Sequence, residues 1–319
     1  MPETDATPLP HENPAEAGTL WPPASTEPTP LRPRFLTGPT GVGWGFLLFV
    51  AIFFVLRTVL SLLVKFLVRD KLPVIWNFAV GEIFSLISAV VPALILCRLE
   101  GRAFGVYGLP RSSAFRKNFW VGMVWGIVAI TVLLAGLRAA GGFYFGSIAL
   151  TPVRAAEYAL FWGVFFILVG LFEEFFLRGY TQFTLSRGLG FWPTALILSS
   201  AFGAMHLSNK GETPAGALGA ALIGLFFCLT LRRTGDLWFA VGLHAAWDWG
   251  ETYLYGVADS GLVAPGHLLN SSSHGPAWLS GGTVGPEASL FVFILMGTMA
   301  VLFHYSYRGV KYPDRGPSD

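Results

Sequence analysis

The stretch LVGLFEEFFLRGYTQFTL, residues 168–185, places two adjacent glutamates and an arginine inside a strongly apolar segment. Glu173, Glu174 and Arg178 occupy positions where a lipid-facing or core helix normally carries leucine. A charged side chain at the middle of a membrane helix costs about 2.5–3.5 kcal/mol on insertion scales, so such residues are rare and usually functional. This stretch therefore predicts a membrane helix that carries a polar site.

The composition of the whole chain indicates a protein that is embedded in the lipid bilayer. Of its 319 residues, 53% are hydrophobic and 13% are charged, whereas soluble domains usually carry about 25% charged residues. The net charge of +2, without basic runs, argues against nucleic acid. Cys97 and Cys228 lie far apart in apolar runs, and we interpret both as packing residues.

About eight apolar segments follow a proline-rich start, since spanning a bilayer takes roughly 20 apolar residues. The fold class is therefore an all-α polytopic membrane protein, with about eight transmembrane helices enclosing a polar intramembrane site. Residues 1–40 form a disordered cytoplasmic arm, 41–310 the membrane domain with a catalytic core at about 155–255, and 311–319 a cytoplasmic tail. The segments are placed at 43–67, 74–97, 119–137, 155–178, 191–207, 214–231, 236–255 and 288–305.

Lysine and arginine are concentrated at one end of these segments. The loop 98–118 and the connection 178–190 are rich in them, whereas the long loop 256–287 contains none. By the positive-inside rule both termini are cytoplasmic. We expect an integral membrane protein, and the character of the chain favours a bacterial inner membrane.

Three segments bring ionisable residues to a similar depth. At a rise of about 1.5 Å per residue, Glu173, His206 and Asp248 lie roughly 20–22 Å from the cytoplasmic ends of their helices, and His244 roughly 13 Å. One shared polar site would require this agreement, whereas scattered structural residues would show it only by chance. Because Glu174 already has a partner one turn later, Glu173 is the carboxylate left as a candidate base.

Simpler interpretations exist for each residue alone. A single buried histidine usually forms only a helix–helix hydrogen bond, and the Glu174–Arg178 and His244–Asp248 pairs, each four residues apart, could be structural contacts. A second pair, Arg57 and Glu82, lies at overlapping depths in the first two segments. We predict a structural salt bridge between these two side chains, outside the site.

Three motifs resemble those of the CPBP family, the CAAX protease and bacteriocin-processing group of intramembrane endopeptidases. They are EEFFLR at 173–178, FGAMH at 202–206 and HAAWD at 244–248, in the order and on the separate segments typical of the family. The resemblance spans about residues 155–255, and the family includes the type II CAAX prenyl endopeptidases. It implies hydrolysis of a peptide bond of a membrane-associated peptide or protein substrate, with or without a lipid modification.

The resemblance also implies roles for individual residues. Glu173 and His206 would hold and activate the attacking water, while Arg178 and Phe202 would shape the site together with Glu174. His244 and position 248 would stabilise the oxyanion. Many relatives carry asparagine at position 248, and an ionised Asp248 cannot donate a hydrogen bond. We therefore expect Asp248 to orient His244, and His244 alone to contact the oxyanion.

The sequence leaves the question of a metal open. Glu173, His206 and His244 have the composition of an open catalytic zinc site, yet no HExxH pattern places two histidines on one helix face. We favour a site that requires no cofactor, with zinc as the alternative.

Two other functions are compatible with these residues. A proton-coupled transporter would also gather glutamate and histidine at mid-membrane, although no internal repeat of the transporter type is visible. A non-catalytic membrane scaffold or bacteriocin-immunity protein would keep the fold without the chemistry.

Overall fold

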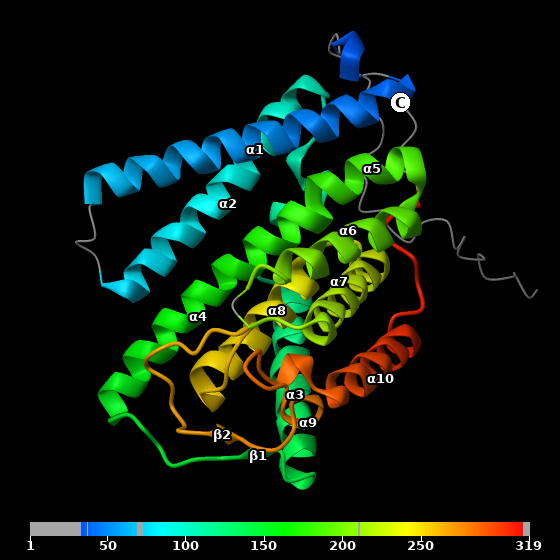
Figure 1. Cartoon of the computed structure of the whole chain (residues 1–319). Helices are drawn as coiled ribbons and strands as arrows, with labels where there is room; N and C mark the ends of the chain where they lie inside the picture. The colour runs from blue at the N-terminus through cyan, green and yellow to red at the C-terminus, as the bar shows by residue number, and fades with distance from the viewer. Residues whose placement is uncertain (1–32, 37, 69–72, 210, 315–319) are drawn as a thin grey trace, which may run out of the picture.

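The computed structural model describes residues 33–36, 38–68, 73–209 and 211–314, and within them the chain is a bundle of helices (Figure 1). The described β-structure is one short antiparallel pair, β1 (Phe143–Tyr144) with β2 (Ser272–Ser273). The main helices are α1 (Gly38–Val68), α2 (Val74–Leu99), α3 (Lys117–Ala139), α4 (Pro152–Glu174), α5 (Gln182–Leu189), α6 (Phe191–His206), α7 (Pro214–Thr234), α8 (Trp238–Trp249) and α10 (Leu290–Ser306).

Shorter helical elements connect or extend the main helices. Two are π-helical: η5 (Phe175–Thr181) joins α4 to α5, and η6 (Gly250–Tyr255) extends α8. The others are η2 (Arg34–Leu36), η3 (Phe104–Tyr107), η4 (Arg111–Ser113), α9 (Ala277–Ser280) and η7 (Pro286–Ala288).

The predicted all-α membrane fold is confirmed. Each of the eight predicted segments coincides with one main helix, apart from small differences at the ends. Within the described residues, five helical spans are long and apolar enough to cross a membrane, namely 40–67, 74–99, 117–139, 152–189 and 214–234. The helices α6, α8 and α10 are shorter, and α8 gains length through η6. Beyond the predicted end of the fourth segment at Arg178, the helical path continues through η5 and α5 to Leu189.

Described residues near both ends of the chain pack against the helix bundle. Most of the predicted arm, residues 1–32, lies outside the described residues, but Leu36 is buried and α1 begins at Gly38. The start of the predicted tail packs back onto the bundle, because Tyr312 is buried and its backbone N–H donates to the carbonyl of Arg232. Apolar contacts of Leu36 and Tyr312 account for both differences.

Side-chain burial follows the expectation for a protein surrounded by lipid. Large apolar residues such as Phe66 and Leu160 are exposed on the outer faces of α1 and α4. In water such a surface would be unfavourable by about 25 cal/mol per Å², whereas lipid tails cover it without cost. The start of α1 lies at one end of the bundle, and the β1–β2 pair lies at the other (Figure 1).

Glycines allow α3 and α8 to pack closely in the centre of the bundle. A Cβ atom at Gly122 would lie 2.1 Å from the carbonyl oxygen of Phe239, and one at Gly126 would lie 2.3 Å from that of Leu243. The spacing of four residues is the small-residue pattern that brings membrane helices together. This contact fixes α8, the helix that carries His244.

We expect Gly242→Ala to disrupt this contact. A Cβ atom at Gly242 would lie 2.1 Å from the carbonyl oxygen of Phe119, so the helices must move apart. The free energy of unfolding should fall by about 1–3 kcal/mol, the usual cost of overpacking. Thermal unfolding in detergent micelles measures it, with Gly297→Ala as the control because nothing lies within 4 Å of a Cβ there. Equal midpoints for both variants would contradict the close packing of α3 and α8.

Candidate active site

The paired glutamates stand where α4 changes its helical form. Glu173 and Glu174 are the last two residues of α4, and the π-helical η5 begins at the next residue. Gly179, inside η5, has φ −84° and ψ −112°, which is not a helical conformation. Single π-helical turns inside α-helices occur frequently at functional sites, because they redirect side chains. The sequence gives no clear signal of this turn beyond Gly179 itself.

Glu174 is the centre of a buried chain of contacts. One of its oxygens, Oε1, accepts hydrogen bonds from Arg178 Nη1 at 3.2 Å and from His244 Nδ1 at 2.9 Å. The side chains of Glu174 and Arg178 are both fully buried. Since the guanidinium is always charged, Glu174 is ionised and can only accept, so His244 carries a proton on Nδ1.

The Arg178 guanidinium lies in an aromatic pocket. Its Cζ atom lies 4.7 Å from the centre of the Phe202 ring and 5.7 Å from that of Phe227. Gly224 makes room for it, because a Cβ at that position would lie 2.3 Å from Nη2. Cation–π contacts of this kind are strongest where water is excluded. Phe202, which the resemblance assigned to shaping the site, therefore contacts it through Arg178.

Three carboxylates surround the single imidazole of His244. Besides Glu174 on Nδ1, Glu173 Oε2 lies 3.7 Å and Asp248 Oδ2 lies 3.4 Å from Nε2. The ring stacks on Phe227, with 5.3 Å between the ring centres. The imidazole is thus oriented by the hydrogen bond that its Nδ1–H donates to Glu174. We had expected Asp248 to orient this ring, and that expectation is corrected. Four-residue spacing within α8 brings Asp248 to the cavity side of the ring rather than behind it.

Glu173 differs from Glu174 in its surroundings. About 29% of its side chain is exposed, against 0% for Glu174, and it lines a cavity of about 470 Å³. Neighbouring residues of a helix point about 100° apart, which explains how one carboxylate is enclosed while the next faces the cavity. As expected from the sequence, no lysine or arginine of the described residues forms an ion pair with Glu173.

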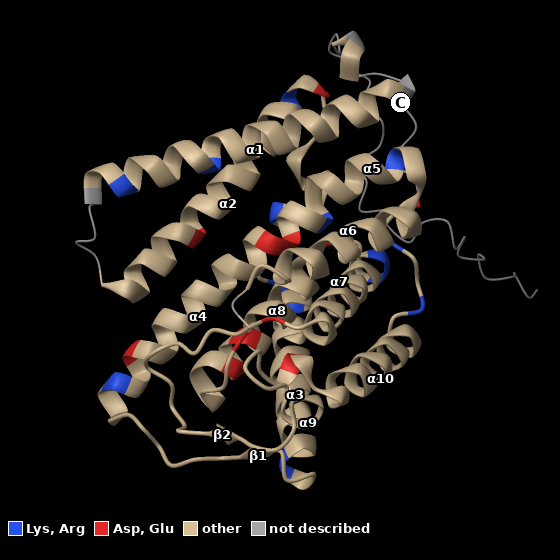
Figure 2. Cartoon of the chain, in the orientation of Figure 1, with Lys and Arg blue, Asp and Glu red and all other residues tan. Residues whose placement is uncertain are grey.

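His206 lies in the wall of the same cavity, at the end of α6. Its Nδ1 lies 2.8 Å from the carbonyl oxygen of Phe202, and their rings contact each other edge to face. Because a carbonyl only accepts, Nδ1 carries the proton, and Nε2 is left as an acceptor. The structure therefore brings the predicted residues from α4, α6 and α8 to one cavity. In Figure 2 the acidic positions near the end of α4 and along α8, in red, lie within the bundle.

The predicted salt bridge between Arg57 and Glu82 is wrong. Arg57 Nη1 donates instead to Ser61 Oγ on its own helix, at 2.7 Å. Glu82 lines the cavity together with Glu173, and one of its oxygens is buried without a hydrogen-bond partner. Helical rise gives the depth of a residue but not the direction in which it points, and here Glu82 lines the cavity whereas Arg57 does not.

The candidate zinc ligands are not gathered into a metal site. Among the described residues, one group of three or more acidic, histidine or cysteine side chains has ligand atoms within 4.8 Å of one another, and it consists of Glu251, Asp259 and Glu287. Glu173, His206 and His244 share the cavity without meeting that criterion. We therefore derive no chemical step through zinc.

Fold and cavity together define an α-helical integral membrane protein with a site of carboxylates and imidazoles inside the bundle. Residues 155–250 match the family model described as type II CAAX prenyl endopeptidase Rce1-like. This match confirms the resemblance inferred from the three motifs, and the matched family is one of CAAX-type proteases, which hydrolyse peptides or proteins. No curated protein matches the chain.

Proposed function

We propose that this protein is an intramembrane endopeptidase in which Glu173 activates a water molecule for attack on a peptide bond. The observation that carries the proposal is the contrast between the two glutamates. Glu174 is enclosed and doubly hydrogen-bonded, whereas Glu173 faces the cavity next to His244 and lacks a cationic partner among the described lysines and arginines. A general base has to be reachable by its water, and of the two adjacent glutamates only Glu173 satisfies that condition.

The water is held between Glu173 and His206. The Nε2 atom of His206 accepts one hydrogen bond from it, while Glu173 removes the other proton as the water oxygen attacks the carbonyl carbon. When the tetrahedral intermediate breaks down, the C–N bond is cleaved and Glu173 returns the proton to the leaving amine.

His244 stabilises the oxyanion of this intermediate. Its Nδ1 proton is held by Glu174, so the imidazole is fixed with Nε2 toward the cavity. The carboxylates of Glu173 and Asp248 near Nε2 favour the doubly protonated ring. An imidazolium aimed at the developing charge in a cavity of low dielectric is an effective electrostatic catalyst. Asp248 acts here through its charge, without donating a hydrogen bond.

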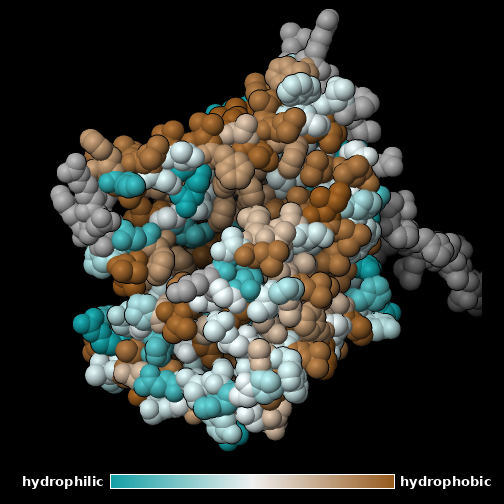
Figure 3. All heavy atoms as spheres, viewed as in Figure 1, coloured by the Kyte–Doolittle hydropathy of each residue, from teal (hydrophilic) through white to brown (hydrophobic). Residues whose placement is uncertain are grey.

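The substrate enters from the bilayer through a groove between α2 and α4. This groove has a volume of about 590 Å³, and apolar residues of both helices line it, among them Trp76, Ile83 and Leu168. Phe165 lines both the groove and the cavity, so the two spaces adjoin. On the same side of the molecule the surface is hollowed, with hydrophilic side chains around the opening (Figure 3). We infer that the groove holds an apolar or lipid-modified part of the substrate.

Filling the groove should weaken binding of an apolar substrate. Ala79 lines it, and Ala79→Trp would displace part of an apolar chain, at about 0.8 kcal/mol for each CH₂ group no longer buried. We expect KM for a lipid-tailed peptide to rise about tenfold, with kcat unchanged, since the groove is remote from the chemistry. Ile87→Trp is the control, because Ile87 is exposed on α2 and lines neither space.

Comparison of new protein termini in membranes of wild-type and Glu173→Gln cells tests the function and identifies the substrate together. Proteolysis predicts a set of termini that appears only with the wild-type protein. If both strains produce the same termini, the endopeptidase proposal fails. A scaffold or transporter would leave the termini unchanged.

A further inference from the structure

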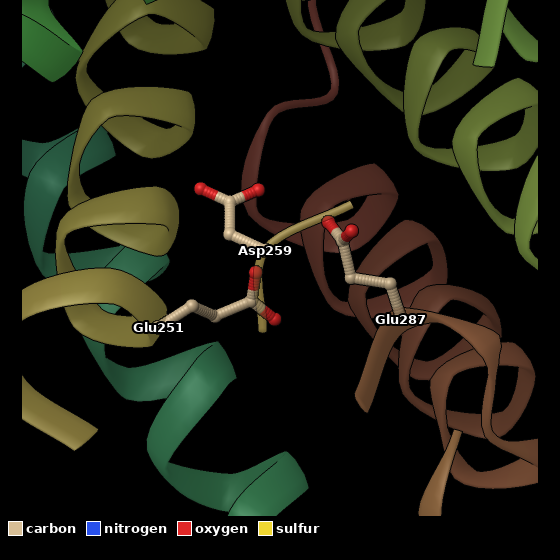
Figure 4. A group of neighbouring side chains, drawn as sticks. All are labelled: Glu251, Asp259 and Glu287. Carbon is tan, nitrogen blue, oxygen red and sulfur yellow. The ribbon is translucent and has the colours of Figure 1, made fainter. Parts of the chain in front are cut away.

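A second acidic cluster lies beyond the proposed hydrolytic residues, where α8 ends. Glu251 belongs to η6, Asp259 to the loop that follows it and Glu287 to η7. One carboxylate oxygen from each lies within 4.8 Å of the other two. Figure 4 shows the three side chains approaching one another from separate segments of the chain.

Glu251 is the unusual member of the cluster. Its side chain is fully buried, and neither of its oxygens has a hydrogen-bond partner. No described lysine or arginine forms an ion pair with any of the three carboxylates. An isolated buried carboxylate without partners is too costly to persist, and most buried polar groups are satisfied. A bound proton or a bound cation must therefore compensate Glu251.

Hydrogen bonds from neighbouring side chains hold the other two carboxylates in place. Glu287 accepts hydrogen bonds from Trp247 Nε1 at 3.3 Å and from the Oγ of Ser260 at 3.0 Å. Asp259 accepts one from the hydroxyl of Thr252 at 3.1 Å. Partners of this kind are typical of carboxylates that bind a metal, because they fix the direction of the remaining oxygens.

The charge of the cluster also indicates a bound cation. Three carboxylates gather here, and Asp248, a fourth, lines the same cavity. The cluster therefore has a strong requirement for positive charge. A small cation between the oxygens would meet it.

We propose that Glu251, Asp259 and Glu287 bind a hard divalent cation of the calcium and magnesium class. The donors are all oxygen, which such ions prefer, and no histidine or cysteine belongs to the group. Calcium takes oxygen ligands at about 2.3–2.6 Å, so oxygens bound to one ion lie up to about 5 Å apart, in agreement with the spacing here. Water and backbone carbonyls complete the coordination.

The cation would fasten the loop after α8 to the wall of the cavity. Asp259, Ser260 and Glu287 all line the cavity that contains Asp248, and Glu251 lies three residues after Asp248. Binding would hold η6, the loop and η7 together and so stabilise that wall. This proposal is independent of the hydrolytic mechanism, because none of its three ligands takes part in the proposed chemistry.

The test uses the full chain, purified in detergent and stripped with EDTA, then titrated with calcium chloride or magnesium chloride. Wild type should bind one calcium or magnesium ion per chain by elemental analysis after dialysis. At about 100 times Kd, the midpoint of thermal unfolding should rise by roughly 5–10 °C. Glu251→Gln should abolish both effects. Without cation, Glu251→Gln should be at least as stable as wild type, since it removes an uncompensated charge.

Two further variants separate this site from others. Glu157→Gln, at an exposed residue of α4, should retain the full response. Glu173→Gln should also retain it, which distinguishes the cluster from a metal bound at the hydrolytic residues. A response that persists in Glu251→Gln would overturn the proposal. So would stripped wild type that binds neither ion and whose unfolding midpoint depends only on pH, because the carboxyls would then share protons instead.

Discussion

Glu173→Gln should reduce kcat/KM for peptide-bond cleavage by at least about 100-fold while leaving the protein folded. Positioned general bases contribute about 10²–10⁴-fold, and an amide cannot take the proton of the water. The substitution keeps the shape of the side chain, and His244 keeps its closer contact with Glu174, so no buried cation is left unpaired. The unfolding midpoint should therefore stay within about 2 °C of wild type.

Cleavage of a substrate peptide in reconstituted vesicles measures the loss. Asp314→Asn is a matched control, because it makes the same chemical change at an exposed carboxylate that lines neither the cavity nor the groove. If Glu173→Gln retained more than about a tenth of the activity, Glu173 would not be the base. His206 or Glu82 would then have to be examined, since both line the same cavity.

Much of the fold was accessible from the sequence, because lipid imposes a simple requirement on every spanning helix. Apolar length located eight of the nine main helices, and the helical rise correctly predicted that Glu173, His206 and Asp248 share one cavity. The π-helical turns η5 and η6 were not predicted, since they depend on local packing rather than on a hydrophobic pattern. The same applies to the packing of Leu36.

The predictions about the site failed mainly where they depended on the direction in which a side chain points around its helix axis. Glu174 was correctly paired with Arg178, but its hydrogen bond to His244 joins two helices and has no signature along the chain. Glu82 was placed at a suitable depth and given the wrong partner. The acidic cluster was missed, although one signal existed. Glu251 is a further glutamate inside a predicted membrane segment, three residues after Asp248.

Glu174→Gln should be much less stable than Glu173→Gln, although the two residues are neighbours. It leaves the fully buried Arg178 without its carboxylate, and breaking one side of a buried ion pair costs about 3–5 kcal/mol. The unfolding midpoint in detergent should fall by about 10 °C. Catalysis should also fall, because the negative charge that supports the His244 imidazolium is lost.

A double variant separates these two effects. In Glu174→Gln with Arg178→Met, no unpaired guanidinium remains, and apolar replacement of a buried pair is often neutral for stability. The midpoint should therefore return toward wild type while kcat stays low, because the glutamine can accept the His244 Nδ1 hydrogen bond but carries no charge. Recovery of both stability and kcat would show that Glu174 serves only to neutralise Arg178. Recovery of stability alone would assign Glu174 to positioning and charging the imidazole that faces the substrate.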